Sequence, residues 1–288
     1  MHRRAGNSRW RRRWSSRGSC FASPSEGLPS RQRNRGSVRG ETMVEVLFCG
    51  TGDAFCSAGQ LQAGYLLCGQ GTRVLLDCGA TTLAALHRHG EDVSAIDMVA
   101  LSHLHGDHFG GLPFLFLEWI YQSRRTRPLE VVGPPGTVER VGSLFRTLYR
   151  DVGSRPLPFP VHYREVLPEE HVKLPGGSLL AFRVPHQERE VSLGFDVSLA
   201  GCRVVYSGDT GWTPELLDRS ADADLFICEC SFYATIVPNH LAYTTLAAVR
   251  DRLRARRTIL THLGRDVLAR RNEVNFELAH DGLRVKLR

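Results

Sequence analysis

The sequence predicts an α/β fold in which two β-sheets pack together and helices cover their outer faces. Short apolar runs bounded by glycine, such as VEVLFCG (44–50) and RVLLDCG (73–79), have the length and composition of buried strands. Segments with helical spacing alternate with such runs in both halves of the chain. With 288 residues, of which 42% are hydrophobic, the chain is long enough to bury a sizeable core.

The elements of the first half follow from local pattern. AGYLLCG (63–69) and RVLLDCG predict a hairpin, because glycine bounds both apolar runs. IDMVALSH (96–103) predicts a further buried strand, and EVVGPPG (130–136) predicts a strand and a turn. Helical spacing predicts helices over 81–90, where Gly90 is the stop signal, over 112–122 and over 137–152.

The second half repeats this organisation with more strands. The predicted strands are VHYREV, HVKL, LLAFRVPH, LGFDVSL, RVVYSGD, DLFICECS and RTILTH. A helix is predicted over 242–254, between the last two of them.

Arginine is concentrated at the start of the chain. Residues 1–42 hold 11 Arg, no Lys and two acidic residues, a net charge of +9, which leaves 26 basic and 28 acidic residues in 43–288. Residues 43–288, the body of the chain, are therefore close to neutral, and their composition does not predict a nucleic-acid-binding face. We predict a disordered Arg/Ser-rich leader over 1–42, consistent with an over-extended start, and one folded domain over 43–288. A transit peptide is the alternative interpretation of the leader.

Apolar runs and cysteines indicate the compartment. No apolar run reaches the roughly 18 residues of a membrane-spanning helix, and the longest, 112–121, contains Glu118. The short apolar runs therefore predict no membrane partner. The eight cysteines form no C-x-x-C pair and mostly lie in apolar runs, which predicts a reducing, cytoplasmic setting. We interpret Cys228 and Cys230 as core residues, with a metal role as the alternative.

Histidine and aspartate collect at the ends of predicted strands. Three of the 12 histidines lie within LSHLHGDHFGG (101–111). The candidate ligands, which end four predicted strands, are His103, His105, Asp107, His108, His186, Asp209 and His262. Any one of these histidines alone would be interpreted as a hydrogen-bonded core residue, but seven ligands at four strand ends predict a site.

The spacing of these residues suits a pair of metal ions. In H-x-H the two imidazoles can reach one ion from an extended segment, and the D-H that follows points towards a second. Imidazole and carboxylate are suitable zinc ligands. Two neighbouring ions lower the pKa of a shared water and hold the attacking and leaving oxygens of an ester.

The motifs resemble those of the metallo-β-lactamase superfamily. HLHGDH is similar to its H-x-H-x-D-H signature, and VPH, SGD and THL resemble its later ligand motifs in the same order, across 44–288. The resemblance implies a four-layer αβ/βα sandwich and a hydrolase with two Zn²⁺ ions, with Mn²⁺ or Fe as alternatives. It implies a first metal on His103, His105 and His186, a second on Asp107, His108 and His262, and a bridge by Asp209.

One segment resembles the ribonuclease Z-like branch in particular. Residues 224–249 are similar to a segment in which a glutamate orients a histidine about ten residues further on, and that histidine protonates the leaving oxygen. Glu229 and His240 match these positions and, with Asp107, are the candidate catalytic residues. GTGDAF (50–55) also resembles the opening turn of that branch, but Cys228 and Ser231 depart from its His and Thr.

The spacing of the later motifs argues for a small substrate. Only 22 residues separate His186 from Asp209, too few for the arm with which longer members hold tRNA. The resemblance therefore implies a phosphodiesterase that acts on a smaller phosphodiester or an RNA end.

Two other functions remain open at this point. The same metal site could hydrolyse a lactone or thioester, for which His240 would be dispensable. A non-catalytic metal-binding or nucleic-acid-binding module is the third hypothesis, with the leader as a nonspecific RNA contact. The five arginines between 250 and 257 are interpreted as a solvated helix face, and the apolar segment 112–121 as a core or homodimer contact.

Overall fold

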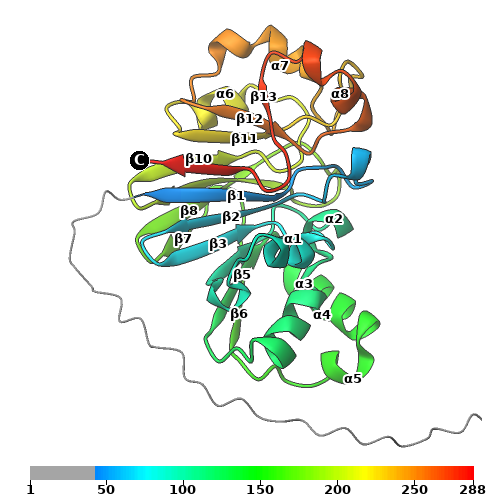
Figure 1. Ribbon diagram of the computed structural model, residues 1–288, viewed down its shortest axis with the longest axis vertical. Coiled ribbons are helices and arrows are strands. Elements are labelled where there is room, and N and C mark those ends of the chain that lie inside the picture. The colour runs from blue at the N-terminus through cyan, green and yellow to red at the C-terminus, as the bar shows by residue number, and fades with distance from the viewer. Residues whose placement is uncertain (1–42) are drawn as a thin grey trace, which may run out of the picture. The chain divides into compact units, whose positions relative to one another are not determined.

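The computed structural model describes residues 43–288, and the predicted leader over 1–42 lies outside the described residues. The described residues form two seven-stranded sheets that pack face to face, with helices on their outer sides (Figure 1). The layers run helix, sheet, sheet, helix. The predicted α/β sandwich is therefore confirmed.

The first sheet has the strand order β14-β1-β2-β3-β4-β5-β6. Its strands are β1 (Val44–Gly50), β2 (Gly64–Gly69), β3 (Thr72–Leu76), β4 (Met98–Ala100), β5 (Leu129–Gly133), β6 (Val161–Glu165) and β14 (Arg284–Leu287). Strands β2 and β3 form the predicted antiparallel hairpin, and β3 to β6 are parallel.

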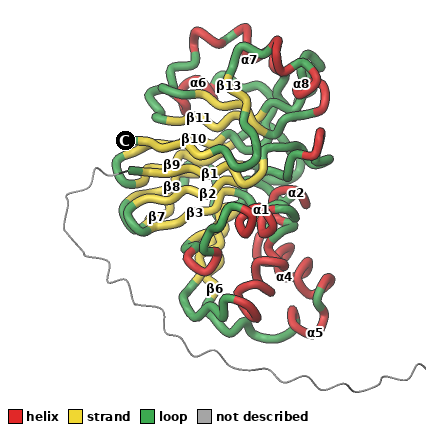
Figure 2. The backbone as a smooth tube through the Cα atoms, viewed as in Figure 1, coloured by secondary structure: helices red, strands yellow, loops and turns green. Residues whose placement is uncertain are grey.

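The second sheet has the strand order β13-β12-β11-β10-β9-β8-β7. Its strands are β7 (His171–Leu174), β8 (Gly177–Arg183), β9 (Leu193–Leu199), β10 (Cys202–Tyr206), β11 (Leu225–Glu229), β12 (Thr258–Thr261) and β13 (Glu277–Leu278). Strands β10 to β13 are parallel, so their carboxyl ends share one edge of the sheet. Figure 2 shows the strands in yellow and the helices in red.

The helices are shorter than the sequence predicted. They are α1 (Thr82–Arg88), α2 (Gly106–Phe109), α3 (Leu112–Leu117), α4 (Thr137–Leu148), α5 (Arg150–Gly153), α6 (Glu215–Ser220), α7 (Tyr243–Ala248) and α8 (Arg265–Ala269). Short 3-10 turns lie at Ser57–Gly59, Val93–Ala95, Arg250–Arg252 and Arg271–Glu273.

Three predicted helices are each divided in the structure. The helix predicted over 112–122 becomes a π turn after Leu117, the one over 137–152 breaks at Tyr149, and the one over 242–254 ends at Ala248. Tyr149 has a φ of −136°, which no α-helical residue adopts. Apolar spacing continued across these breaks, so the pattern alone indicated one helix in each case.

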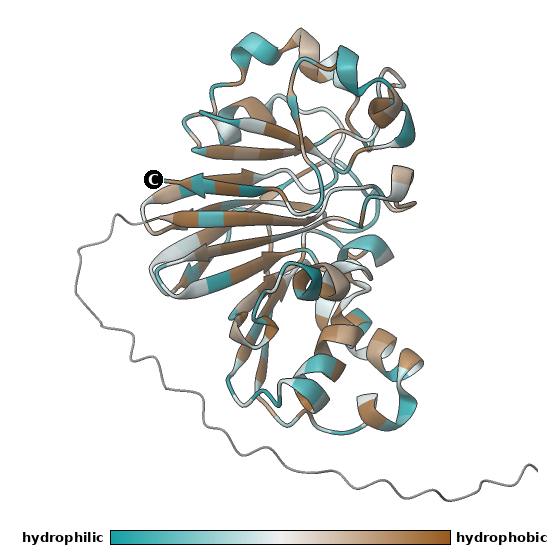
Figure 3. Ribbon diagram, viewed as in Figure 1, coloured by the Kyte–Doolittle hydropathy of each residue, from teal (hydrophilic) through white to brown (hydrophobic). Residues whose placement is uncertain are grey.

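Strict alternation along the strands builds the core. Val46 and Phe48 of β1 face the space between the sheets, where they join residues such as Phe195 and Ile227 of the second sheet. Leu47, between them, faces outward and packs with the helices of the first sheet. The inner strands are accordingly apolar along most of their length (Figure 3), because both of their faces are buried, whereas edge strands such as β7 and β14 expose every second residue.

The outer layers contain two features that the sequence interpretation addressed. Cys228 and Cys230 are buried in the apolar cluster between the second sheet and its helices, in agreement with a core role. Most of the segment over 112–121 is also core, since Leu115, Phe116 and Trp119 are buried. A homodimer contact through its exposed residues, such as Tyr121, stays a prediction.

Strand β14 was not predicted from the sequence. It pairs antiparallel with β1, from Val44 with Leu287 to Leu47 with Arg284. The segment is short and half of it is charged, so it has no clear strand signal before its partner is known.

The arginines between 250 and 257 do not form a helix face, which corrects the sequence interpretation. Only Arg250–Arg252 is a 3-10 turn, and the chain then leaves helical structure. Arg256 pairs with Asp224 and Arg257 with Glu277, at 2.9 and 2.6 Å. Two of the five charges therefore serve local ion pairs.

No helix among the described residues combines the length and the apolar character that crossing a membrane requires.

The packing between the sheets predicts a sharp contrast between two phenylalanines. Phe195 is fully buried between the sheets, whereas Phe55 is 86% exposed. Phe195→Ala is expected to lower the free energy of unfolding by about 3–5 kcal/mol, because it leaves a cavity in the core. Phe55→Ala is the matched control and should leave stability unchanged. Urea unfolding of the full chain measures both, and equal stability of the two variants would contradict this core.

Candidate metal centre and active site

Four strand ends carry the seven predicted ligands to one place. The segment with His103, His105, Asp107 and His108 follows β4 and enters α2, and three further residues follow β8, β10 and β12. The latter are His186, Asp209 and His262. The structure brings all seven side chains together in two adjoining groups.

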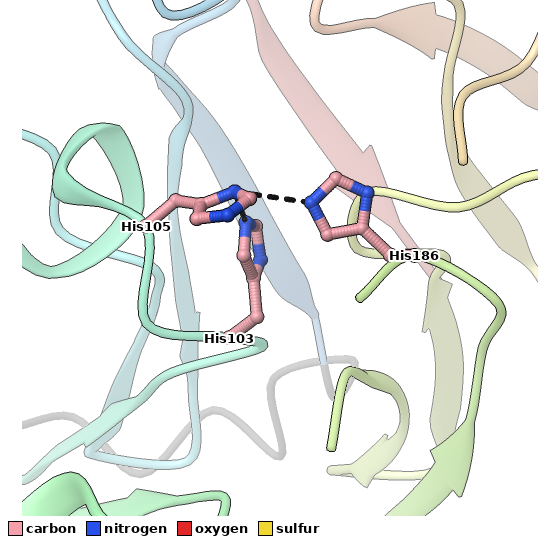
Figure 4. A group of neighbouring side chains, drawn as sticks. All are labelled: His103, His105 and His186. Carbon is pink, nitrogen blue, oxygen red and sulfur yellow. Dashed lines mark hydrogen bonds between the residues drawn. The ribbon is translucent and has the colours of Figure 1, made fainter. Parts of the chain in front are cut away.

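The first group consists of His103, His105 and His186 (Figure 4), whose ligand atoms lie within 4.8 Å of one another. Nδ1 of His105 lies 3.1 Å from Nε2 of His103 and 3.1 Å from Nε2 of His186. Burial lowers the pKa of all three imidazoles. They are therefore neutral near pH 7, which is the form that binds a metal ion.

The second group consists of Asp107, His108, Asp209 and His262, again within 4.8 Å. Oδ2 of Asp209 lies 3.3 Å from Nε2 of both His108 and His262, and 3.9 Å from Nε2 of His103. Asp209 thus contacts both groups. This is the position that the bridging role implied by the family resemblance requires.

The charges in the second group suit a cation. Burial raises the pKa of Asp107 and Asp209, but the neighbouring imidazoles outweigh it and hold both pKa values below the ordinary range. Conversely, burial lowers the pKa of His262, but Asp209 and Asp107 raise it to about 9. The two carboxylates are therefore ionised and attract positive charge.

Two buried atoms also lack a partner among the described residues. Nε2 of His108 lies 3.3 Å from Oδ2 of Asp107 and of Asp209 without forming a hydrogen bond, and Oδ1 of Asp209 has no hydrogen-bond partner. A buried polar atom without a partner is costly, about 1–3 kcal/mol, and both of these atoms face the ligand groups. A metal ion would satisfy them, and the nitrogen and oxygen donors present fit a divalent ion such as zinc.

Asp77 is a supporting residue that the sequence interpretation missed. Its buried carboxylate accepts hydrogen bonds from the amide and the hydroxyl of Ser102, from Nδ1 of His108 and from the hydroxyl of Tyr206, at 2.7 to 2.8 Å. Because Nδ1 of His108 must carry a proton to donate, Nε2 is left free towards the ligand group. Asp77 ends β3 in RVLLDCG, so its place at a strand end was the available signal.

His186 and His262 also have a fixed partner for the ring nitrogen that points away from the ligand groups. Nδ1 of His186 lies 2.8 Å from the carbonyl of Asn239, and Nδ1 of His262 lies 2.9 Å from Oγ of Ser231. His262 itself has a φ of 53°, a left-handed conformation that a non-glycine residue adopts only where its surroundings impose it.

Glu229 and His240 form a second pair beside the ligand groups. Glu229 is fully buried at the end of β11 and accepts hydrogen bonds from the amide of Thr210 and the hydroxyl of Ser231. Nδ1 of His240 lies 3.0 Å from Oε1 of Glu229, and its ring stacks 5.9 Å from that of His262. Burial lowers the pKa of His240, but Glu229 outweighs it and raises that pKa above its ordinary value. Glu229 therefore favours the protonated form of His240, which lines the cavity beside the ligand groups.

The loop that carries His240 packs closely on the second sheet. A Cβ at Gly211 would lie 1.8 Å from the carbonyl oxygen of Pro238, so only glycine allows this approach. The amide of Gly211 also donates to the carbonyl of Pro185, next to His186.

A cavity of about 480 Å³ opens onto these residues. The residues that line it include Asp107, Asp209, His240, Phe55, Phe232 and Arg265. This volume lies in the lower half of the range that is usual for small-molecule sites, about 300–1,000 Å³.

Comparisons with known proteins agree with this geometry. A family model described as anti-Pycsar protein Apyc1 matches residues 44–280. The chain is 27% identical over 233 residues to the ribonuclease Z of Lachnoclostridium phytofermentans, covering 65% of this chain and 74% of that relative.

Solved structures of two similar proteins share the fold. Human tRNase Z, short form (ELAC1), matches with a TM-score of 0.68 and 26% identity, over 84% of this chain and 98% of that one. The metallo-β-lactamase fold protein YhfI from Bacillus subtilis matches with a TM-score of 0.69 and 20% identity, over 85% and 100%. The predicted resemblance to ribonuclease Z-like proteins of the metallo-β-lactamase superfamily is confirmed.

Replacing the buried carboxylate of Asp77 should destabilise the protein independently of any metal. Asp77→Asn keeps the shape of the side chain but places an amide among four hydrogen-bond donors. Urea unfolding in the presence of a chelator is expected to give a free energy of unfolding lower by about 3 kcal/mol. Asp251→Asn, at an exposed position, is the control and should have no effect. A stable Asp77→Asn variant would mean that Asp77 does not anchor the site.

Proposed function

This chain belongs to the family of anti-Pycsar protein Apyc1, and we propose that it is a binuclear metal-dependent phosphodiesterase that acts on a small phosphodiester or an RNA end. The chain is a ribonuclease Z-like hydrolase of the metallo-β-lactamase fold. The observation that carries the finer proposal is the Glu229–His240 pair beside the seven clustered ligands. Of the three hypotheses that the sequence left open, only a phosphodiesterase has a use for that pair.

The proposed metal ligands follow the two groups of side chains. His103, His105 and His186 hold one ion, Asp107, His108 and His262 hold the other, and Asp209 contacts both. Two divalent ions bound there would lower the pKa of a water molecule towards neutrality and withdraw charge from the phosphoryl oxygens. We propose Zn²⁺, with Mn²⁺ or Fe as alternatives, because the donors are imidazole nitrogens and carboxylate oxygens.

His240 is proposed as the general acid. An alkoxide is a poor leaving group, so its oxygen needs a proton as the bond to phosphorus breaks. In our proposal Nδ1 of His240 donates to Oε1 of Glu229, and Nε2 gives its proton to the leaving oxygen. The amide of Thr210 and the hydroxyl of Ser231 keep Glu229 oriented. Asp107, which lines the cavity, is the remaining candidate catalytic residue.

Three features support a small substrate. The 22 residues between His186 and Asp209 form a short loop, β9 and β10, so none are left for a substrate-holding arm. The cavity holds about 480 Å³, and the body has a net charge near zero. A phosphodiester of modest size fits these features better than a folded RNA, which binds through many phosphate contacts.

The described cysteines support the proposed cytoplasmic setting. Cys49, Cys56, Cys68, Cys78, Cys202, Cys228 and Cys230 are all free. Thiols persist in this form in a reducing compartment.

Metal removal tests the class of mechanism. The full chain is expected to hydrolyse bis-p-nitrophenyl phosphate, to lose that activity after treatment with a strong chelator, and to regain it with Zn²⁺ or Mn²⁺. Elemental analysis before and after chelation gives the metal content. Activity that persists in metal-free protein would refute the proposal.

The choice of leaving group tests the role of His240. His240→Ala is expected to reduce kcat for a phosphodiester with an alkoxide leaving group by about 10²–10⁴-fold. With p-nitrophenolate, which leaves without protonation, the loss should be much smaller. His171→Ala, at an exposed position on β7, is the matched control. An equal loss for both leaving groups, or loss of metal from His240→Ala, would show that His240 is not the general acid.

A substrate screen separates the alternatives. Linear and cyclic phosphodiesters, a lactone and a thioester are compared with the wild-type protein and His240→Ala. Faster turnover of the lactone or thioester, unaffected by His240→Ala, would favour the carboxyl-ester alternative.

A further inference from the structure

We infer that Gln187 is a positioning residue for the metal ligand His105, and that the Arg140–Glu190 ion pair braces it. The inference rests on the proposed function, because it concerns the same metal centre. It goes beyond that proposal by assigning a role to three residues that neither the motifs nor the ligand groups include.

Four of the five ligand histidines share one arrangement. Each directs one nitrogen into the ligand groups, and its other nitrogen lies against a fixed partner. These partners are Ser102 for His103, Asp77 for His108, Asn239 for His186 and Ser231 for His262, at 2.8 to 3.0 Å. Such partners set the orientation of the ring and decide which nitrogen carries the proton.

His105 is the exposed member of the set, and Gln187 is its outer partner. Nδ1 of His105 faces His103 and His186, while Nε2 lies 3.2 Å from the side-chain amide of Gln187. A neutral imidazole that offers Nδ1 to a metal carries its proton on Nε2 and needs an acceptor there. Rotation of the Gln187 amide by 180° presents Oε1 at this position.

Of the two neighbours of Gln187, Ser192 is compatible with this rotation. The hydroxyl of Ser192 lies 3.2 Å from Oε1 of Gln187, and a hydroxyl can donate to the oxygen or accept from the nitrogen. The carboxylate of Glu190 lies 3.3 Å from Nε2 of Gln187. After the rotation this donor contact is replaced by an approach of Oε1 to a carboxylate whose charge is paired with Arg140. Ser192 then holds Gln187, and Oε1 accepts from Nε2 of His105.

Arg140 connects this loop to the H-x-H segment. Its Nη1 lies 3.0 and 2.8 Å from the two carboxylate oxygens of Glu190, and its Nη2 donates to the carbonyl of Leu104 at 2.8 Å. Leu104 lies between His103 and His105, and the loop with Glu190 begins at His186. One guanidinium from α4 thus joins the backbone of two ligands to the loop of the third.

The geometry predicts a specific defect when Gln187 is removed. In Gln187→Ala the ring of His105 loses its outer acceptor, so the affinity for one of two Zn²⁺ ions is expected to fall by about 10–100-fold. In Gln187→Glu a carboxylate accepts from Nε2 of His105, and Arg140 compensates the neighbouring charge of Glu190, so the affinity should stay within about threefold of the wild-type value. Gln122→Ala, at an exposed position distant in sequence, should match the wild type.

The experiment measures Zn²⁺ affinity of the full chain by competition with a chromophoric chelator, together with the Tm of the chelated protein. Weakening of one ion in Gln187→Ala, recovery in Gln187→Glu and an unchanged Tm support the inference. Three results would overturn it: unaltered affinity in Gln187→Ala, a Tm that falls together with the affinity for both ions, or no recovery in Gln187→Glu. A wild-type protein that binds no metal would instead refute the proposed function itself, and the inference with it.

Discussion

The burial of carboxylates at one edge of two packed sheets is the constraint on which the rest of this structure depends. Asp77, Asp209 and the half-buried Asp107 would each cost several kcal/mol as unpaired ions in the protein interior. Asp77 is compensated by four hydrogen bonds. Asp209 keeps one oxygen without a partner among the described residues. The carboxylate of Asp77 thus anchors the structure, and the carboxylate of Asp209 is suited to bind a cation.

The sandwich makes this concentration of polar groups possible. The inner strands are apolar on both faces, so the sheets remain stable while their ends hold polar side chains. At these ends the backbone adopts conformations that a regular strand does not. Asp77 and His262 have φ values of 57° and 53°, and each turns its side chain into the site directly after its strand ends.

The site has two parts with separate requirements. In the first ligand group burial favours neutral imidazoles, because it lowers the pKa of His103 and His186. In the second group the ionised Asp209 raises the pKa of His262, so those imidazoles retain their protons until a cation takes their place. The Glu229–His240 pair needs an imidazole that retains its proton, and the buried glutamate provides it. Ser231 contacts Glu229, His240 and His262, so the two parts are linked through one hydroxyl.

The sequence by itself determined the fold class and the seven candidate ligands, because both can be read from short segments of the chain. Apolar runs mark the strands, and the residues that end them are carried to a common edge whenever those strands are parallel. It could also name Glu229 and His240, but only through resemblance to a family segment. The breaks in the helices after Leu117 and at Tyr149 were not visible in the apolar spacing, which continues across them.

Only the tertiary structure decided which residues orient the metal ligands through hydrogen bonds and ion pairs. Asp77 contacts Tyr206, which is 129 positions away, and Arg140 contacts Glu190, which is 50 positions away. The pairing of β14 with β1 joins the two ends of the folded domain. None of these contacts has a periodic signal, because each depends on where two distant segments meet. Hydrogen bonds and ion pairs act over a few ångströms in space, whatever the separation along the chain.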